Sequence, residues 1–193
     1  TYKDASATTA DWQTTNSRAQ LNKTFFGSAT TVSVSPAGAS AVLTAVDVSG
    51  SYAYIAVLNT TTTDLMIVDL NNTSNVYTLD LNTGTRARDI KVGGNYAYII
   101  TDTSGGSLYI VDVTDPTSPS VAGSESLTNG GIGVDVSGNY AYIAADAQGL
   151  AVIDISNKTN PGAPVYLDTT AAGCASSVVV NGRYAYISAG RLN

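Results

Sequence analysis

Side chains that could take part in chemistry are few in this sequence, and histidine is absent. The 193 residues include 15 Asp and Glu, nine Lys and Arg, and a single cysteine, Cys174. Without histidine, neither a Ser–His–Asp nor a Cys–His catalytic arrangement can form within the chain. A zinc site would need carboxylates and one thiolate, which is a rare ligand set. We therefore predict no catalytic residue and no resident metal, and we interpret Cys174, which lies among small apolar residues, as a buried filler.

Two sets of aspartates recur along the chain. The first set follows apolar segments and precedes turns: Asp69, Asp112 and Asp154. Aspartates in this position accept hydrogen bonds from backbone amides that follow them, and we favour that role over metal binding. The second set, Asp47 and Asp135, has Lys91 and Val179 at the equivalent positions of the other units. That replacement argues against a symmetric ion site.

The elements that carry these side chains repeat with a fixed period. The segment Tyr-Ala-Tyr-Ile begins at residues 52, 96, 140 and 184, so the period is 44 residues (96 − 52). A second segment, apolar throughout and ending in the first set of aspartates, begins at Leu65, Leu108 and Leu150. Fixed spacing of this kind is the signature of a repeat architecture.

Each unit is predicted to form four antiparallel strands. The first ends before a glycine-containing two-residue turn, and the second carries Tyr-Ala-Tyr-Ile, with both tyrosines on one face. The third is the apolar segment, which is expected to be buried on both faces. The fourth is an outer strand near residues 76–81, 121–124 and 165–168. Four such strands in about 44 residues match one blade of a β-propeller.

These motifs resemble the LVIVD repeat. The resemblance spans residues 45–188 and is carried best by residues 108–119, with their Asp-Pro-Thr-Ser-Pro turn, and by 134–155. It implies an all-β fold of propeller blades and an extracellular or cell-surface location. It implies no catalytic set. The first unit departs from the pattern, because Asn71-Asn72-Thr73-Ser74-Asn75 replaces the proline-containing turn.

The two ends of the sequence differ from the repeats. Residues 1–40 are rich in Thr, Ser and Ala and are interpreted as an N-terminal segment or linker, with a short helix near residues 11–21 and a lone strand at 31–35. Residues 41–193 hold about 3.5 blades. Because closed propellers need about four to eight blades, three outcomes are open. The chain is part of a longer protein, two copies associate, or residues 1–40 cap the open end.

Composition narrows the choice of function. The net charge of −6 disfavours nucleic acid as a partner, and no apolar run is long enough to span a bilayer. Our first hypothesis is a non-catalytic scaffold, adhesion or assembly module that binds a protein partner or itself through open blade edges. The alternative is a domain that binds carbohydrate or a small ligand. The weak candidate residues for that role lie in the loops between second and third strands and are Asp102, Asp146 and Gln148. Calcium is a possible cofactor at such loops.

Overall fold

The computed structural model describes residues 42–58, 63–81, 86–101, 106–169 and 173–190, together with the backbone of residues 19–25 and 28–34. The described residues contain sixteen strands and no helix. No described segment is therefore a helix of the length and apolar character that a membrane span needs. The predicted all-β class is confirmed.

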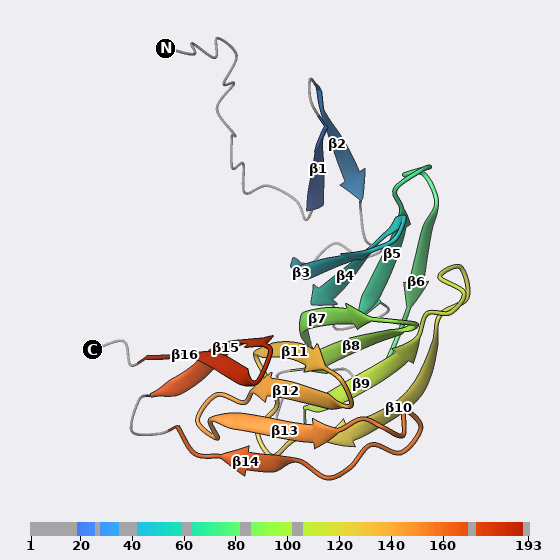
Figure 1. The fold of residues 1–193 in the computed structure, drawn as a ribbon. Coiled ribbons are helices and arrows are strands. Elements are labelled where there is room, and N and C mark those ends of the chain that lie inside the picture. Colours follow the sequence, from blue (N-terminus) through green and yellow to red (C-terminus); the bar gives the residue numbers. More distant parts are fainter. Residues whose placement is uncertain are drawn as a thin grey trace, which may run out of the picture.

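Three four-stranded antiparallel sheets follow one another along the chain, each a meander of consecutive strands (Figure 1). The first is β3 (Val42–Ser49), β4 (Tyr52–Leu58), β5 (Leu65–Asp69) and β6 (Val76–Leu79). The second is β7 (Ala87–Gly93), β8 (Tyr96–Thr101), β9 (Ser107–Asp112) and β10 (Ser120–Ser126). The third is β11 (Gly133–Ser137), β12 (Tyr140–Ala144), β13 (Leu150–Asp154) and β14 (Val165–Leu167). We call these sheets blades 1, 2 and 3.

A fourth unit contributes two described strands, β15 (Cys174–Asn181) and β16 (Tyr184–Gly190), which we call blade 4. The first strands of the four units, β3, β7, β11 and β15, lie next to one another in chain order. The blades therefore fan out around a common inner side, as in an open propeller (Figure 1).

Glycine makes the hairpin between the first two strands of every unit. Gly50, Gly94, Gly138 and Gly182 have φ between 58° and 60°, and each is the first residue of a two-residue loop. Positive φ at this position matches the right-handed twist of the flanking strands and is accessible to glycine at little cost. The repeated turn therefore fixes the register that places the tyrosines.

Packing between blades follows the predicted division of the second strand into two faces. Tyr54 and Ile67 of blade 1 share a buried cluster with Ala97, Ile99 and Val111 of blade 2. The same contact recurs one blade later, between Tyr98 and Ile110 of blade 2 and the Ala-Ile face of blade 3. Each fully buried side chain of this size stabilises the fold by roughly 1.5–3 kcal/mol. The tyrosine face of one blade is thus the partner of the Ala-Ile face of the next.

The N-terminal segment is partly different from the prediction. The expected helix near residues 11–21 is wrong at its C-terminal end, because β1 (Ala19–Phe25) is a strand; residues 11–18 lie outside the described part. The strand expected at 31–35 exists as β2 (Ser28–Val34), but it pairs with β1 and is not alone. The Thr and Val residues of β2 favour strand, and pairing with β1 satisfies both backbones.

Candidate functional site

The aspartates that end the third strands bind backbone amides, as the sequence predicts. Each carboxylate accepts a hydrogen bond from the backbone N–H two residues further along the chain, at 2.8 Å. The pairs are Asp69 with Asn71, Asp112 with Thr114, and Asp154 with Ser156. Hydrogen bonds with Thr114 lower the pKa of Asp112, and those with Ser156 lower the pKa of Asp154. Hydrogen bonding stabilises the charged form. These three carboxylates fasten turns and are not gathered at a ligand site.

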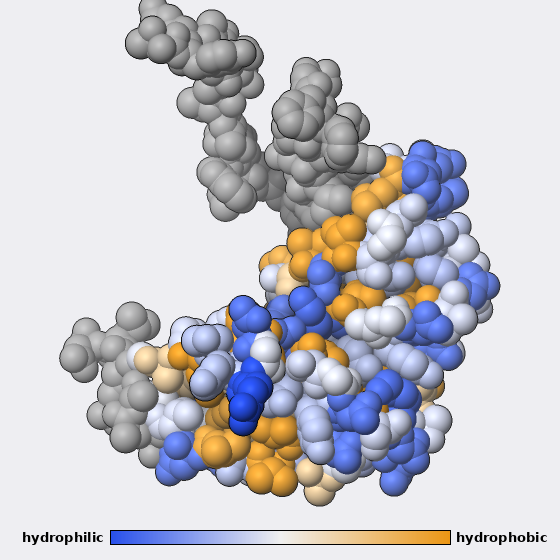
Figure 2. Space-filling view, viewed as in Figure 1, coloured by the Kyte–Doolittle hydropathy of each residue, from blue (hydrophilic) through white to orange (hydrophobic). Residues whose placement is uncertain are grey.

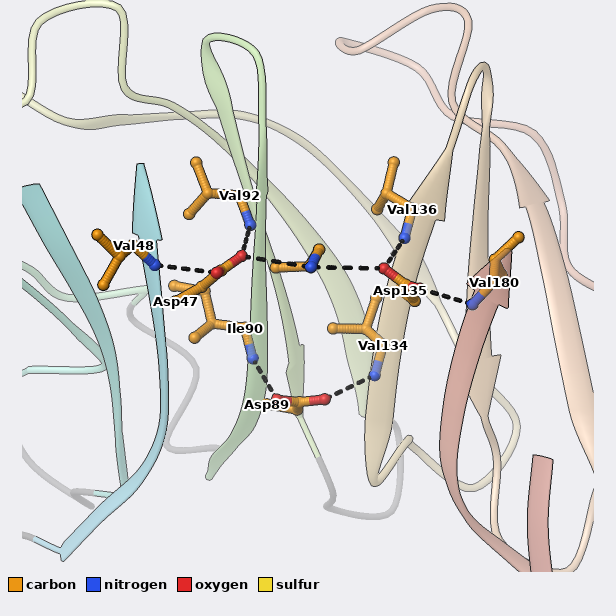
Figure 3. Close-up of polar contacts among 10 residues, drawn as sticks. Asp47, Val48, Asp89, Ile90, Val92, Val134, Asp135, Val136 and Val180 are labelled. Atoms are coloured by element: carbon orange, nitrogen blue, oxygen red, sulfur yellow. Dashed lines mark hydrogen bonds and ion pairs between the residues drawn. The ribbon is translucent and has the colours of Figure 1, made fainter. Parts of the chain in front are cut away.

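A second set of aspartates joins neighbouring blades at their first strands (Figure 3). The carboxylate of Asp47 accepts N–H groups from Val48 of its own strand, at 2.9 Å, and from Val92 of the next blade, at 2.8 Å. Asp135 does the same with Val136, at 2.9 Å, and with Val180, at 2.7 Å. Each carboxylate therefore uses both oxygens to hold two inner strands together.

Asp89 makes the equivalent link between blades 2 and 3. Its two carboxylate oxygens accept hydrogen bonds from the backbone N–H of Ile90, at 2.9 Å, and from that of Val134, at 2.8 Å. Burial raises the pKa of Asp89, while the hydrogen bonds from Val134 and Ile90 oppose that rise. Comparison at the 44-residue period overlooks this residue, because Asp89 stands two positions before the place that Asp47 and Asp135 share. Two residues along a strand return to the same face, and that periodicity is the signal that could have found it.

Lys91 occupies the shared position in blade 2. Its ammonium group lies 3.8 Å from Asp47 and 3.7 Å from Asp135, so one cation is placed between the carboxylates of blades 1 and 3. In blade 4 the corresponding positions hold Val179 and Ser177, neither of which is acidic. The row of linking carboxylates therefore ends at the blade 3–blade 4 junction. Within the described residues no cluster of three or more acidic or cysteine side chains suits a metal.

The three loop candidates do not form a site together in the described structure. Asp102 lies outside the described residues. Asp146 and Gln148 share the tight turn between β12 and β13, where Asp146 has a φ of 49° and its carbonyl accepts the N–H groups of Gly149 and Ala175. The N–H of Gln148 donates to the carbonyl of Ala145 at 2.9 Å. These contacts account for the backbone of the turn, and ligand binding by the three side chains stays a prediction.

Asp64, which the sequence analysis did not single out, is a buried carboxyl group at the start of β5. It is 3% exposed and accepts the N–H of Leu81 at 2.9 Å. Burial raises its pKa to about 6, against an opposing effect of the Leu81 hydrogen bond. No repeated pattern marks this residue, because the position before the leucine of the third strand is Ser107 in blade 2 and Gly149 in blade 3.

The interpretation of Cys174 as a buried filler is wrong, because its side chain is exposed. Alternation along β15 turns the neighbouring Ala175 toward blade 3, where it is fully buried, and turns Cys174 toward the opposite face. No described strand covers that face, so the apolar surroundings in the sequence did not translate into burial.

The open face of blade 4 exposes its two tyrosines more than the equivalent residues of other blades are exposed. Tyr186 is 60% exposed, whereas its equivalents Tyr54 and Tyr98 are 3% and 2% exposed. Tyr184 is 69% exposed, and its ring centroid lies 6.4 Å from that of Tyr186. Val179 of the adjacent strand adds to the same face at 57% exposure. Figure 2 shows further hydrophobic surface at this end of the array, over β14. Its exposed residues are Val165 and Leu167.

A groove of about 500 Å³ opens between blades 2 and 3, beside the hairpin turns. Tyr96, Tyr98, Asn95 and Lys158 supply its larger side chains. The ammonium group of Lys158 lies 5.6 Å and 5.9 Å from the two tyrosine ring centroids and donates a hydrogen bond to the carbonyl of Ile155. The groove therefore combines aromatic surface with hydrogen-bonding groups and one positive charge.

Comparison with known families decides the architecture. A profile of the LVIVD repeat matches four times, over residues 44–79, 84–125, 132–169 and 172–191. The chain belongs to the LVIVD repeat family. The four matches coincide with blades 1 to 4, so the LVIVD unit of this chain is the blade itself, and the resemblance seen in the sequence is confirmed.

One solved structure supports the fold and adds nothing on activity. The computationally designed Ika4 protein is similar over 80% of this chain and 89% of its own length, with a TM-score of 0.59 and 11% sequence identity. A chain of a complex of S. cerevisiae Dbp5 with Nup159, Gle1, IP6 and ADP is 16% identical over 72% of this chain and 36% of its own, with a TM-score of 0.44. No curated protein matches the chain.

Proposed function

We propose that this LVIVD repeat chain is a non-catalytic scaffold or assembly module of a secreted or surface-associated protein. It binds a protein partner, or another copy of itself, through the open end of its blade array. The observation that carries the proposal is the exposure of Tyr184, Tyr186 and Val179 on one face of blade 4. Adjacent exposed aromatic residues of this kind mark protein interaction surfaces.

The repeated packing within the chain supports the same proposal. Where a following blade is present, the face that carries the second Tyr of Tyr-Ala-Tyr-Ile packs against it: Tyr54 and Tyr98 are buried, and Tyr142, which faces blade 4, is partly buried. Blade 4 carries the same residues on a face without such a neighbour among the described strands. Covering that face would remove the same kind of apolar surface from water that the internal junctions bury.

Light scattering on a sizing column tests the assembly role. We expect the mass of the wild-type chain to rise with concentration, and the double substitution Tyr184→Ser/Tyr186→Ser to suppress that rise. Tyr140→Ser is the matched control, because Tyr140 is the blade 3 equivalent of Tyr184 and is 46% exposed. A wild-type mass that is constant at the monomer value would contradict self-assembly and leave a separate protein partner as the remaining form of the proposal.

A second candidate function is the binding of a saccharide or another small polar ligand in the groove between blades 2 and 3. The supporting observation is the convergence of Tyr96, Tyr98, Asn95 and Lys158 around about 500 Å³. Aromatic walls with a few polar groups are typical of small-molecule sites. Titration of oligosaccharides followed by NMR would test it, with Asn95→Ala as the disrupting variant. Shifts confined to residues outside the groove would contradict this assignment.

A further inference from the structure

Blade 4 presents an open strand edge as well as an open face, and together they specify the chemistry of a partner. We propose that the outer edge of β16 accepts an extended segment of the pattern Leu-x-Ile/Val-Ile/Val-Asp as an antiparallel third strand, with its aspartate opposite Tyr184. This inference rests on the proposed binding role and names the partner class: a strand-donating polypeptide segment whose own edges are unpaired.

The register follows from three copies of the same pairing within the chain. The leading tyrosine stands opposite the strand-end aspartate in every complete blade: Tyr52 opposite Asp69, Tyr96 opposite Asp112, and Tyr140 opposite Asp154. The residue four positions further along the second strand stands opposite the leucine in each case, as Ala144 stands opposite Leu150. Since β16 has the same sequence pattern, Tyr184 and Ser188 are the positions where the donor's aspartate and leucine would lie.

The edge of β16 is available for this pairing among the described residues. One side of β16 pairs with β15 from Tyr184 to Gly190, and no described strand pairs with the other side. An unpaired strand edge presents a row of N–H and C=O groups that can accept a further strand, and added main-chain hydrogen bonds supply affinity in such complexes.

Both faces of an added strand would meet apolar side chains. The donor's leucine and its first Ile/Val would lie on the side of Tyr184 and Tyr186, which are 69% and 60% exposed. The second residue of the pattern and its second Ile/Val would lie on the side of Ala185 and Ile187. Ala185 and Ile187 are only partly buried, and they pack against the same apolar cluster as Tyr142 and Val152 of blade 3. A donor segment apolar on both faces fits this position better than a segment with one polar face.

A folded second copy does not offer such a segment. Each of its Leu-x-Ile/Val-Ile/Val-Asp strands, β5, β9 and β13, is already paired on both edges. The Ala-Ile face of blade 1, which could otherwise cover the tyrosines, is itself buried, with Ala53 at 0%, Ile55 at 2% and Met66 at 1% exposure. The partner is therefore a separate segment that has no paired strand to lose.

The probe is a fluorescein-labelled peptide of residues 149–158 of this chain, which contains the pattern Leu-Ala-Val-Ile-Asp. We expect saturable binding to the full chain by fluorescence anisotropy, and no saturable binding of the reversed-sequence peptide. Tyr184→Ser/Tyr186→Ser should weaken peptide binding by about tenfold or more, as loss of two aromatic anchors does at other interfaces. The matched Tyr140→Ser chain should bind like the wild type. Equal binding of both peptides, or none of either, overturns the inference.

Disulfide trapping tests the register. In a Cys174→Ser background, Ser188→Cys is mixed with peptides that carry cysteine in place of Gly149, Leu150 or Ala151. We expect the cysteine at position 150 to cross-link in preference to the other two, because only that position stands opposite residue 188. Preference for another position overturns the register. Concentration-dependent self-association that the peptide does not inhibit would leave the proposed function intact and refute the strand-donor mechanism.

Discussion

At the scale of single residues, Asp64 makes a prediction about pH. Its pKa of about 6 in the folded chain lies above the ordinary value of 3.8. Between about pH 4 and pH 6 the folded state therefore keeps a proton that the unfolded chain has released. By linkage, the contribution of this group to the free energy of unfolding falls as pH rises through that window. Asp64→Asn should remove this fall, since the amide oxygen can still accept the N–H of Leu81.

Urea denaturation of the wild type and of Asp64→Asn between pH 4 and pH 7 checks this prediction. We expect the unfolding free energy of Asp64→Asn, relative to that of the wild type, to increase as the pH increases. Asp154→Asn is the control without a slope, because hydrogen bonds lower the pKa of Asp154, so this group is ionised throughout the window and its contribution to stability changes little between pH 4 and pH 7. A pH-independent difference between the wild type and Asp64→Asn would refute the elevated pKa.

Lys91 and Asp89 both connect neighbouring blades, Lys91 through ion pairs and Asp89 through hydrogen bonds to backbone N–H groups. Lys91→Met removes the cation from between Asp47 and Asp135, and the Lys91 side chain is 41% exposed. Screened ion pairs of this kind contribute about 0–1 kcal/mol each, so we expect a modest loss of stability that shrinks in about 1 M salt. In Asp89→Asn the side-chain oxygen can accept only one of the two backbone N–H groups, and the other N–H faces the side-chain NH₂ group, which is also a donor. We expect the free energy of unfolding to fall by about 1–3 kcal/mol at any salt concentration.

Thermal denaturation at low and high salt separates these two effects. The Lys91→Met chain should approach the wild type as salt increases, whereas the Asp89→Asn chain should not. Equal salt dependence of the two variants would show that the inner strands are held by one kind of interaction only.

At the scale of elements, close backbone packing between blades depends on Gly123 in β10. A Cβ atom at this position would collide with the carbonyl oxygen of Lys158 and lie 3.0 Å from that of Thr159. Because the obstacles are backbone atoms, the turn that carries Lys158 would have to shift. We expect Gly123→Ala to reduce the free energy of unfolding by roughly 1–3 kcal/mol, as overpacking does elsewhere.

Gly190→Ala is the control for Gly123→Ala. No atom lies within 4 Å of a Cβ built at Gly190, and its φ is not positive. This variant should be neutral or slightly more stable in urea denaturation, because alanine restricts the unfolded chain. A Gly123→Ala chain that behaves like Gly190→Ala would mean that the turn moves at no cost.

Strands and turns could be predicted from the sequence wherever the same residue pattern recurs in each 44-residue unit. The glycine turns and the two-faced Tyr-Ala-Tyr-Ile strand are local properties that recur in all four units, and the buried third strand recurs in blades 1 to 3. Asp89 was missed because its role depends on a backbone N–H group of the next blade. Cys174 was wrongly predicted to be buried because its burial depends on whether a neighbouring blade covers the face of β15 on which it lies. Asp64 carries no repeated signal at all. The apolar contacts between blades recur with the repeat, whereas the polar contacts made by Asp89, Lys91 and Asp64 do not.

At the scale of the whole molecule, stability is shared among junctions between consecutive blades. In a linear array each unit is held by its neighbours, so a terminal unit has fewer junctions than an internal one. Blade 4 also has only two described strands, one of which has an unpaired edge. Its backbone hydrogen bonds should therefore open more readily than those of blades 2 and 3.

Hydrogen–deuterium exchange measures this difference directly. Amides of β16 should exchange faster than those of β8 and β12, which carry the same Tyr-Ala-Tyr-Ile sequence between two paired strands. Because the local sequence is identical, a difference in protection reports the missing junction and not intrinsic exchange chemistry. Addition of the strand-donor peptide should raise protection in β16 selectively and leave β8 unchanged. Equal protection of β16 and β12 without peptide, in a chain of monomeric mass, would contradict an open edge at β16.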